Sequence, residues 1–534
     1  MEWIGVIVWG IIRVSLVVLL VRVVFSWWIL PVLAHRKLKR NGFNGGPPPR
    51  FPLGNITEIK NTMKKAAASA AAAAINGGAG AFSSSSNISH DIHSTVFPYF
   101  AQWQTSYGKK FVYWLGTEPF LYIAEPQFVK NMSEAVMGKG WGKPAVFRND
   151  REPMFGDGLV MTEGDDWIRH RHILTPAFNP ANLKAMTRLM VGSTTKMLDE
   201  WARRLSSGGP EMDVEREITA TAGDIIAKAS FGICDRSGRD AFNKLRDLQF
   251  TLFRNSSYVG VPFSSIFLYP TRTLTAKRLG SEIDRLFLSI ISERKQSPDA
   301  SASDLLSRLI ESQRNDSAPA AGKSWLTTRE LVDECKTFFF GGHETTALAI
   351  SWTMLLLATR PEWQTILREE IKEVIGDREI DFAMLSRLKK MGWVFNEVLR
   401  LYPSAPNIQR QAKGDIKVGD TTIPKGTNIW IDIVAMHHDP SLWGDDVNEF
   451  KPERFEKDSI HGGCKHKMGY LPFGFGGRMC IGRNLSSMEY KIVLTLIISR
   501  FSLSISPSYS HSPAILLSLR PAHGLPLILK PLHP

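Results

Sequence analysis

The segment from Phe473 to Gly482 reads F-G-F-G-G-R-M-C-I-G and places one cysteine, Cys480, on a glycine-rich loop. A thiolate that serves as the sole protein ligand of iron pushes electron density toward O–O cleavage. Glycine has no Cβ, so these glycines let the backbone turn tightly and approach a flat cofactor. Arg478 precedes the cysteine by two residues and can meet an acidic edge of that cofactor. The spacing therefore predicts a thiolate metal site rather than an inert buried cysteine.

A second group of reactive residues lies inside a long apolar helix that is expected between Thr327 and Pro361. Its middle reads G-G-H-E-T-T, from Gly341 to Thr346. Each glycine in a helix interior costs about 1 kcal/mol relative to alanine, which suggests that another group must approach the backbone closely. The acid and the hydroxyls that follow can bind and transfer protons. We interpret this segment as a dioxygen pocket, and the alternative is a polar patch that faces a neighbouring helix.

Two pairs of residues with an arginine occur at helical spacing. Trp167 and Arg171 lie one turn apart, so that an indole N–H and a guanidinium can reach the same anion. Glu397 and Arg400 share one helix face, an arrangement that alone is typical of a surface ion pair. Each pair is weak evidence by itself, and their order along the chain relative to Cys480 is far more specific.

Together these motifs resemble the signatures of the cytochrome P450 superfamily. The loop matches the haem-binding pattern F-x-x-G-x-R-x-C-x-G, with Gly477 where proline is common. The segment G-G-H-E-T-T matches the oxygen-binding motif, W-x-x-x-R matches the haem-propionate helix, and E-x-x-R with the later P-E-R-F matches the remaining pair of motifs. The resemblance covers most of the chain from about residue 100. It implies a mainly α fold with small β-sheets, the cytochrome P450 fold, preceded here by an N-terminal membrane helix.

The resemblance also implies the role of each residue. Glu344 and Thr345 are the catalytic pair, in which Thr345 donates a hydrogen bond to dioxygen and Glu344 delivers protons from solvent. Cys480 is the metal ligand of haem b, iron protoporphyrin IX. The contacts to this cofactor are assigned to Trp167, Arg171, Arg410, Phe473, Arg478, Cys480 and Gly482. A buried structural network behind the haem is assigned to Glu397, Arg400 and Arg454.

Residues 1–34 have the composition of a membrane anchor. The run from Trp3 to Leu33 is almost continuously apolar, and the basic segment His35–Arg40 follows it. About 20 apolar residues span a bilayer, and the basic flank tends to be cytoplasmic. An acidic start and a long apolar core are unlike a cleaved signal peptide. We expect a single-pass anchor in the endoplasmic reticulum membrane with a cytoplasmic catalytic domain. Because Arg13 and Arg22 interrupt the run, a peripheral amphipathic segment is the alternative.

The rest of the chain divides by composition. We expect a basic and proline-rich hinge at 35–54, a low-complexity flexible insertion at 64–89 whose alanines can form a short helix, and a haem-thiolate catalytic domain at 96–534. Short strands are expected at 112–114, at 121–123 and within 416–433, and a polar linker at 312–323. Four cysteines are too few for a disulfide framework and fit a reducing compartment.

The charge and the motifs limit the choice of partners. A net charge of +13, spread along the chain, suits an anionic membrane or an acidic protein, and no nucleic-acid-binding motif accompanies it. No dinucleotide fingerprint and no flavin domain are present, so electrons must come from a separate protein. The resemblance implies that this protein is NADPH–cytochrome P450 reductase. Lys465, Lys467 and Arg483 flank the thiolate loop and are predicted as its docking face, with a solvated charge run as the alternative.

The expected activity is the hydroxylation of a lipophilic small molecule with O₂. The amino-acid sequence at 164–167 and 335–346 is similar to sequences of the plant 72-type clan. This clan includes cytokinin side-chain hydroxylases, gibberellin-modifying enzymes and fatty-acid hydroxylases. The substrate stays open among a cytokinin, a gibberellin and a fatty acid. Two alternatives come from other classes: a haem-thiolate lyase or isomerase that acts on a hydroperoxide, and a non-enzymatic haem sensor. The intact pair Glu344–Thr345 argues against both.

Overall fold

The computed structural model describes residues 2–76, 88–135, 140–232, 236–254, 258–296, 304–314 and 325–532. Residues 77–87, the glycine- and serine-rich part of the predicted insertion at 64–89, lie outside the described residues, and so do residues 315–323 of the predicted linker at 312–323. The alanine run of the insertion is helical and belongs to α3 (Ile56–Asn76). Alanine has the highest helix propensity of all residues, which accounts for this part of the insertion.

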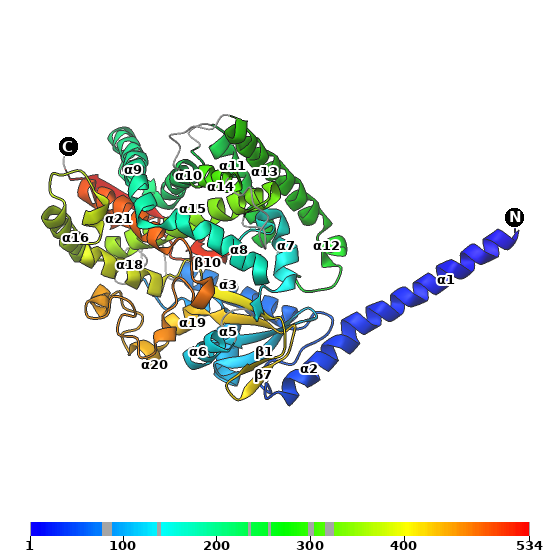
Figure 1. Ribbon diagram of the computed structural model, residues 1–534. Helices are drawn as coiled ribbons and strands as arrows, with labels where there is room; N and C mark the ends of the chain where they lie inside the picture. Colours follow the sequence, from blue (N-terminus) through cyan, green and yellow to red (C-terminus); the bar gives the residue numbers. More distant parts are fainter. Residues whose placement is uncertain are drawn as a thin grey trace.

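The chain begins with a helix that extends away from the rest of the molecule (Figure 1). It comprises α1 (Glu2–Val24), a π-helical turn η1 (Phe25–Ile29) and α2 (Leu30–Arg40). The stretch Trp9–Arg40 is long and apolar enough to cross a membrane, and almost none of its most apolar part is buried. Large apolar side chains that no other part of a protein covers mark a surface for membrane or partner contact. This helix therefore agrees with the predicted N-terminal anchor.

The last turns of this helix pack on the body of the molecule. Leu38 is buried, and the His35 ring lies 6.0 Å from the Trp114 ring. Lys37 forms an ion pair of 3.1 Å with Asp415. Part of the segment predicted as a hinge at 35–54 is thus helical and docked, because lysine, arginine and leucine are all good helix formers. The segment Gly45–Pro49 follows this docked helix.

A five-stranded sheet forms the lower layer in Figure 1, with the strand order β1-β2-β8-β5-β3. Its strands are β1 (Lys110–Leu115), β2 (Glu118–Ile123), β8 (Asn428–Asp432), β5 (Asn407–Ala412) and β3 (Trp141–Gly142). The strands β2 and β8 are parallel, and the other neighbours are antiparallel. Gly116 turns the β1–β2 hairpin with φ +61°, and a Cβ there would lie 2.1 Å from the carbonyl oxygen of Gly260. The expected strands at 112–114 and 121–123 are confirmed.

Three smaller sheets complete the β-structure. They pair β6 (Ile416–Val418) with β7 (Thr421–Ile423), β10 (Pro513–Leu516) with β11 (Ser518–Pro521), and β4 (Glu211–Asp213) with β12 (Pro526–Pro531) and β9 (Phe501–Ile505). The β6–β7 hairpin and β8 account for the strands that were expected within 416–433.

The helix α15 (Thr328–Thr359) runs through the centre of the helical layer (Figure 1). Its start is a capping box: the Glu330 N–H donates to the Thr327 hydroxyl at 3.2 Å, and the Thr327 N–H donates to the Glu330 carboxylate at 2.7 Å. It ends before Pro361, as the sequence predicts. Its neighbours include α10 (Val214–Phe231), α18 (Lys389–Leu401) and α21 (Arg483–Arg500).

The remaining helices surround this core. The α-helices are α4 (His93–Val96), α5 (Pro98–Tyr107), α6 (Pro126–Glu134), α7 (Ala145–Phe155), α8 (Gly164–Leu174), α9 (Pro180–Gly208), α11 (Arg236–Phe253), α12 (Ser264–Phe267), α13 (Pro270–Gln296), α14 (Leu305–Arg314), α16 (Pro361–Val374), α17 (Phe382–Leu385), α19 (Ile433–His437) and α20 (Pro440–Trp443). The 3₁₀ turns are η3 (Thr175–Phe178), η4 (Pro452–Phe455), η5 (Lys467–Gly469) and η6 (Gly476–Arg478). The mainly α fold with small β-sheets is confirmed.

The predicted structural network lies between α18 and η4. The Arg400 guanidinium donates to both carboxylate oxygens of Glu397, at 2.8 and 2.7 Å, and both residues are fully buried. Arg400 also donates to the backbone carbonyls of His437, Val447 and Glu449. The Arg454 Nε lies 3.6 Å from the same Glu397 carboxylate. Buried charges are tolerated only when their hydrogen bonds are made, and the Glu397–Arg400 pair meets that condition. The buried Nε of Arg454 has no hydrogen-bond partner among the described residues.

Deleting residues 1–34 should move much of the protein from the membrane to the soluble or salt-extractable fraction. The deletion removes the exposed apolar helix and leaves the docked residues Lys37 and Leu38 in place, so haem binding should persist. Membrane fractionation and the haem absorption of each fraction measure both effects. If the shortened chain stays in the membrane through high salt and alkaline carbonate, another segment provides the anchor.

Candidate active site

The loop of Cys480 joins η6 to α21. Gly474 and Gly476 adopt positive φ, +75° and +63°, which only glycine accepts without strain. The Cys480 N–H donates to the Phe473 carbonyl at 2.9 Å and closes the loop. Gly482 is the N-cap residue of α21, so the cysteine side chain lies just before the N-terminus of an 18-residue helix. The positive end of a helix dipole favours an anionic group at this place.

Some groups around Cys480 raise the pKa of its thiol and others lower it. Burial raises the pKa of the Cys480 thiol, whereas the Gly482 N–H and the positive charges of Arg171 and Arg483 lower that pKa. The thiol forms no disulfide, and its side chain is exposed although it lies deep in the protein. A side chain that lies deep in a protein and still has accessible surface lines an internal space. A bound metal ion would deprotonate such a thiol outright.

The adjacent glycines of α15 serve two different purposes. A Cβ at Gly342 would lie 2.5 Å from Ile226 Cδ1 on α10, so Gly342 permits the close packing of these two helices. A Cβ at Gly341 would meet no atom within 4 Å, and Gly341 is exposed in the middle of a helix whose other residues are mostly buried. An open space therefore lies against α15 at Gly341. Thr345, one turn later on the same helix face, borders that space.

The Thr345 hydroxyl donates to the Gly341 carbonyl at 2.8 Å. The Thr345 carbonyl in turn accepts a hydrogen bond of 2.8 Å from the Ser404 hydroxyl, which precedes β5. The next residue, Thr346, donates to Ser486 at 3.0 Å and joins α15 to the first turn of α21. These contacts bring the oxygen-binding motif close to the helix that follows the Cys480 loop.

Glu344 is almost fully buried and belongs to a polar cluster between α15, α11 and β11. Its Oε1 accepts hydrogen bonds from Gln249 at 2.7 Å and from the Ser518 hydroxyl, and Arg520 Nη1 lies 3.9 Å away. The Oε2 atom accepts no hydrogen bond from the described residues. Arg520 continues the cluster to Glu215 at 2.5 Å. The partners of Glu344 come from distant parts of the chain, so no local pattern could predict them.

A group of buried cations lies near the loop and has too few counter-charges. Burial and, to a smaller extent, the Arg478 charge lower the pKa of Arg410 to about 9, and burial lowers that of Arg478 to about 10. Burial also lowers the pKa of Lys143 well below its usual value, with the charges of Arg410, Arg478 and Arg151 adding to the shift. Among the described residues, Glu163 is the only carboxylate that offsets the Lys143 and Arg478 charges, and it already pairs with Lys413 at 2.7 Å. Buried positive charges of this kind need an anion.

The structure brings Trp167, Arg410 and Arg478 of the predicted set together, and it adds Lys143. The Arg478 guanidinium stacks 4.7 Å from the centre of the Trp167 ring. Lys143 could not be predicted from the sequence, because a single lysine in a loop belongs to no spacing pattern. Arg171 is placed differently: it donates to the Met479 carbonyl at 2.9 Å, beside the cysteine.

These residues fit the haem that the sequence predicts. Cys480 supplies a single thiolate ligand, the open surface at Gly341 leaves room for a flat group, and the buried cations suit two carboxylates at one edge. Arg478 Nε is buried without a hydrogen-bond partner, which points to an acceptor that the protein itself does not provide.

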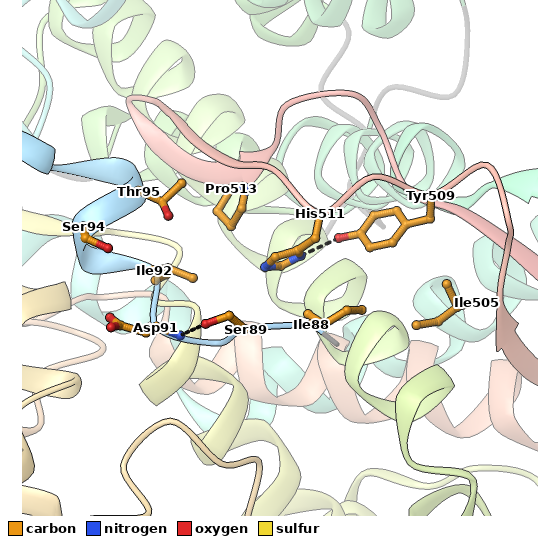
Figure 2. A pocket seen from close by; sticks show the side chains of 10 residues that line it. All are labelled: Ile88, Ser89, Asp91, Ile92, Ser94, Thr95, Ile505, Tyr509, His511 and Pro513. Carbon is orange, nitrogen blue, oxygen red and sulfur yellow. Dashed lines mark hydrogen bonds between the residues drawn. The ribbon is translucent and has the colours of Figure 1, made fainter. Parts of the chain in front are cut away.

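A separate cavity of about 420 Å³ lies between the segment 88–95 and the residues around β10, as Figure 2 shows. The His511 ring faces this cavity, and its Nδ1 is 2.8 Å from the Tyr509 hydroxyl. None of the predicted site residues lines this cavity. It is therefore distinct from the site around Cys480.

Comparison with known proteins agrees with this geometry. The family model described as "Cytochrome P450" matches residues 86–522, which include every motif above. A "Cytokinin hydroxylase" of Arabidopsis thaliana is 36% identical over 515 residues, covering 95% of this chain and 94% of that protein. "Cytochrome P450 714C2" of Oryza sativa subsp. japonica is 35% identical over 511 residues, with coverages of 95% and 94%. "Cytochrome P450 734A1" of Arabidopsis thaliana is 33% identical over 526 residues, with coverages of 94% and 93%.

Proposed function

The chain belongs to the cytochrome P450 family, and from that premise we propose that it is a hormone or lipid hydroxylase of the endoplasmic reticulum membrane. Membership makes it a monooxygenase that binds haem iron and takes electrons from a redox partner. The observation that carries the proposal is the placement of Cys480, a free thiol just before α21, the helix that Thr346 of α15 contacts through Ser486.

The cofactor is haem b in this proposal. When bound, haem supplies the iron chemistry that splits dioxygen. Cys480 would supply its thiolate ligand, and Phe473 and Gly482 hold the loop through their backbone groups. Trp167, Arg410, Arg478 and Lys143 hold the carboxylate edge, and Arg171 supports the loop from the side of Met479.

Thr345 and Glu344 handle the protons of the reaction. The Thr345 hydroxyl borders the open surface and donates to the Gly341 carbonyl, so it can rotate and donate to dioxygen instead. Oε2 is the oxygen of Glu344 that is available to relay a proton, because the donors of Gln249 and Ser518 occupy Oε1. Positioned donors and acids of this kind contribute on the order of a hundredfold in rate each.

The electron donor in this proposal is NADPH–cytochrome P450 reductase. Lys465 and Lys467 are exposed, and they line a surface hollow of about 430 Å³ together with Lys130. Arg483 is exposed at the first residue of α21, three residues after Cys480. A basic face this close to the thiolate loop suits an acidic partner protein and short electron transfer. The N-terminal helix keeps the enzyme on the membrane in which its partner and its lipophilic substrates reside.

The substrate is a cytokinin, a gibberellin or a fatty acid. One relative is named as a cytokinin hydroxylase, which supports a plant hormone. The residues before Gly341 are aromatic: Phe338, Phe339 and Phe340 are buried, and Phe340 contacts Phe155 at a ring distance of 5.4 Å. Aromatic side chains provide a large apolar surface for a lipophilic molecule.

Microsomes that contain this chain and the reductase should convert one of the three substrate classes into a product with one added oxygen atom. Each class is supplied separately, and product formation should require NADPH, O₂ and the reductase. Mass spectrometry of the extracts measures the product. Conversion of a fatty-acid hydroperoxide without NADPH would instead favour a lyase or isomerase, and haem binding without any product would favour a sensor.

A further inference from the structure

One half-buried arginine of α7 has no ionic partner among the described residues. Arg151 donates from Nη1 to the Gln409 side chain at 3.1 Å, and this is its only hydrogen bond to the described residues. Its Nε is buried without a partner, and it forms no ion pair with a described residue. A guanidinium carries five N–H donors, so most of its capacity is unused.

The carboxylate next to Arg151 is already occupied. Asp150 accepts two hydrogen bonds from Arg272, at 2.8 and 2.9 Å, in a bidentate pair. Burial lowers the pKa of Arg151 to about 10, with Arg272 adding to the shift and Asp150 opposing it. The side chain is therefore still a cation at neutral pH. A buried cation is costly unless an anion neutralises it.

Aromatic rings fix the position of the guanidinium. The Phe147 ring centre lies 4.4 Å from the Arg151 Cζ, and the Phe253 ring centre lies 5.1 Å from it. Such contacts favour the cation, but they contribute no counter-charge. The side chain is only partly covered, so a ligand can reach the guanidinium.

Two sets of side-chain contacts connect Arg151 with the site, one through α7 and one through β5. Phe155 lies one turn after Arg151 on the same helix face and packs against Phe340, the residue before Gly341. Gln409, which holds Arg151, follows Ser404 by five residues, and Ser404 contacts the Thr345 carbonyl. Five residues of extended chain span at most about 18 Å, so Gln409 lies within about 18 Å of Ser404. This distance is of the order of the length of a C16 fatty-acid chain.

We infer that Arg151 binds the carboxylate of the substrate, and that the substrate is a lipophilic carboxylic acid. The two oxygens of a carboxylate match the free N–H groups of the guanidinium, and the apolar remainder extends past Phe155 toward Thr345. This inference rests on the proposed function. Of the three proposed substrate classes it selects the two carboxylic acids, a gibberellin or a fatty acid, and excludes the uncharged cytokinins.

The test compares acids with their methyl esters on the haem-loaded protein. The probes are hexadecanoate, gibberellin A4, their methyl esters and the cytokinin trans-zeatin, and equilibrium dialysis gives each Kd. The unchanged protein should bind one acid at least about tenfold more tightly than its ester, because a charge-assisted hydrogen bond is lost in the ester. The acid that shows this preference identifies the class. Equal binding of acid and ester, or tightest binding of trans-zeatin, would overturn the inference.

Variants locate the effect on the residue. Arg151→Gln should weaken acid binding by about tenfold to a hundredfold and leave ester binding within about twofold. Arg148→Gln is the matched control, because Arg148 lies on the same helix with its side chain 42% exposed and 3.7 Å from Glu163. It should leave the Kd of the acid unchanged. Loss of haem from Arg151→Gln would assign Arg151 to the cofactor instead and overturn the inference.

The same samples separate this inference from the proposed function. If the reduced carbon monoxide complex of the unchanged protein lacks the red-shifted Soret band, the haem-thiolate proposal fails. If that band is present and the acids show no preference over their esters, only the role of Arg151 fails. The acid–ester comparison needs no variant, so it stands even if Arg151→Gln does not fold.

Discussion

Replacing Cys480 by serine should abolish the red-shifted Soret band of the reduced carbon monoxide complex and, with it, all NADPH-dependent hydroxylation. That band reports a thiolate opposite carbon monoxide, and a serine hydroxyl does not ionise near neutral pH. The loop itself should survive, because the Cys480 N–H still donates to the Phe473 carbonyl and Gly482 still begins α21. Absorption spectra of the purified variant measure the effect.

Cys464→Ser provides the matched control for this experiment. Cys464 is also a free cysteine in a loop. It is half-buried, and its thiol lies against Gly469 rather than in the site. Its replacement should leave the red-shifted band intact. A band that survives in Cys480→Ser, or one that disappears only in Cys464→Ser, would remove Cys480 from the role of ligand.

Thr345→Ala should keep haem content and substrate binding close to those of the parent while hydroxylation falls by about tenfold to a thousandfold. Among the described residues, the Thr345 hydroxyl bonds only the Gly341 carbonyl, so its removal breaks no contact to the loop or to the buried cations. NADPH should still be consumed, with hydrogen peroxide in place of product. Parallel assays of NADPH, peroxide and product give the coupling ratio.

Thr345→Ser keeps the hydroxyl and should retain most of the coupling, which separates proton handling from packing. Full coupling in Thr345→Ala would place the proton donor elsewhere, for example at Thr346, whose hydroxyl contacts Ser486. Loss of haem from Thr345→Ala would mean that this face of α15 supports the cofactor rather than the chemistry.

Local sequence patterns predicted the parts of the site that lie within one element. The capping box of Thr327 and Glu330 and the end of α15 before Pro361 both follow from residue types a few positions apart. The pair Glu397 and Arg400 is likewise local, and the structure confirms that it is buried and fully bonded. These features depend on helix periodicity, which the sequence shows directly.

Contacts between distant segments could not be predicted in this way. Gln249 and Ser518 reach Glu344 from 95 and 174 residues away, and Lys143 approaches Arg410 and Arg478 only in the folded chain. The basic run after the anchor illustrates a competing local preference. Charge and nearby prolines predicted a hinge. Helix propensity and the packing of Leu38 instead continue the helix to Arg40.

The central claim is that this chain inserts one atom of O₂ into its substrate, and isotope labelling tests it most directly. The purified chain and the reductase are supplied with NADPH, the acid that binds most tightly and oxygen gas labelled with the heavy isotope. We predict a product with one labelled oxygen atom, and its formation should stop without NADPH. A product with unlabelled oxygen, or one that forms from a hydroperoxide without NADPH, would contradict the account.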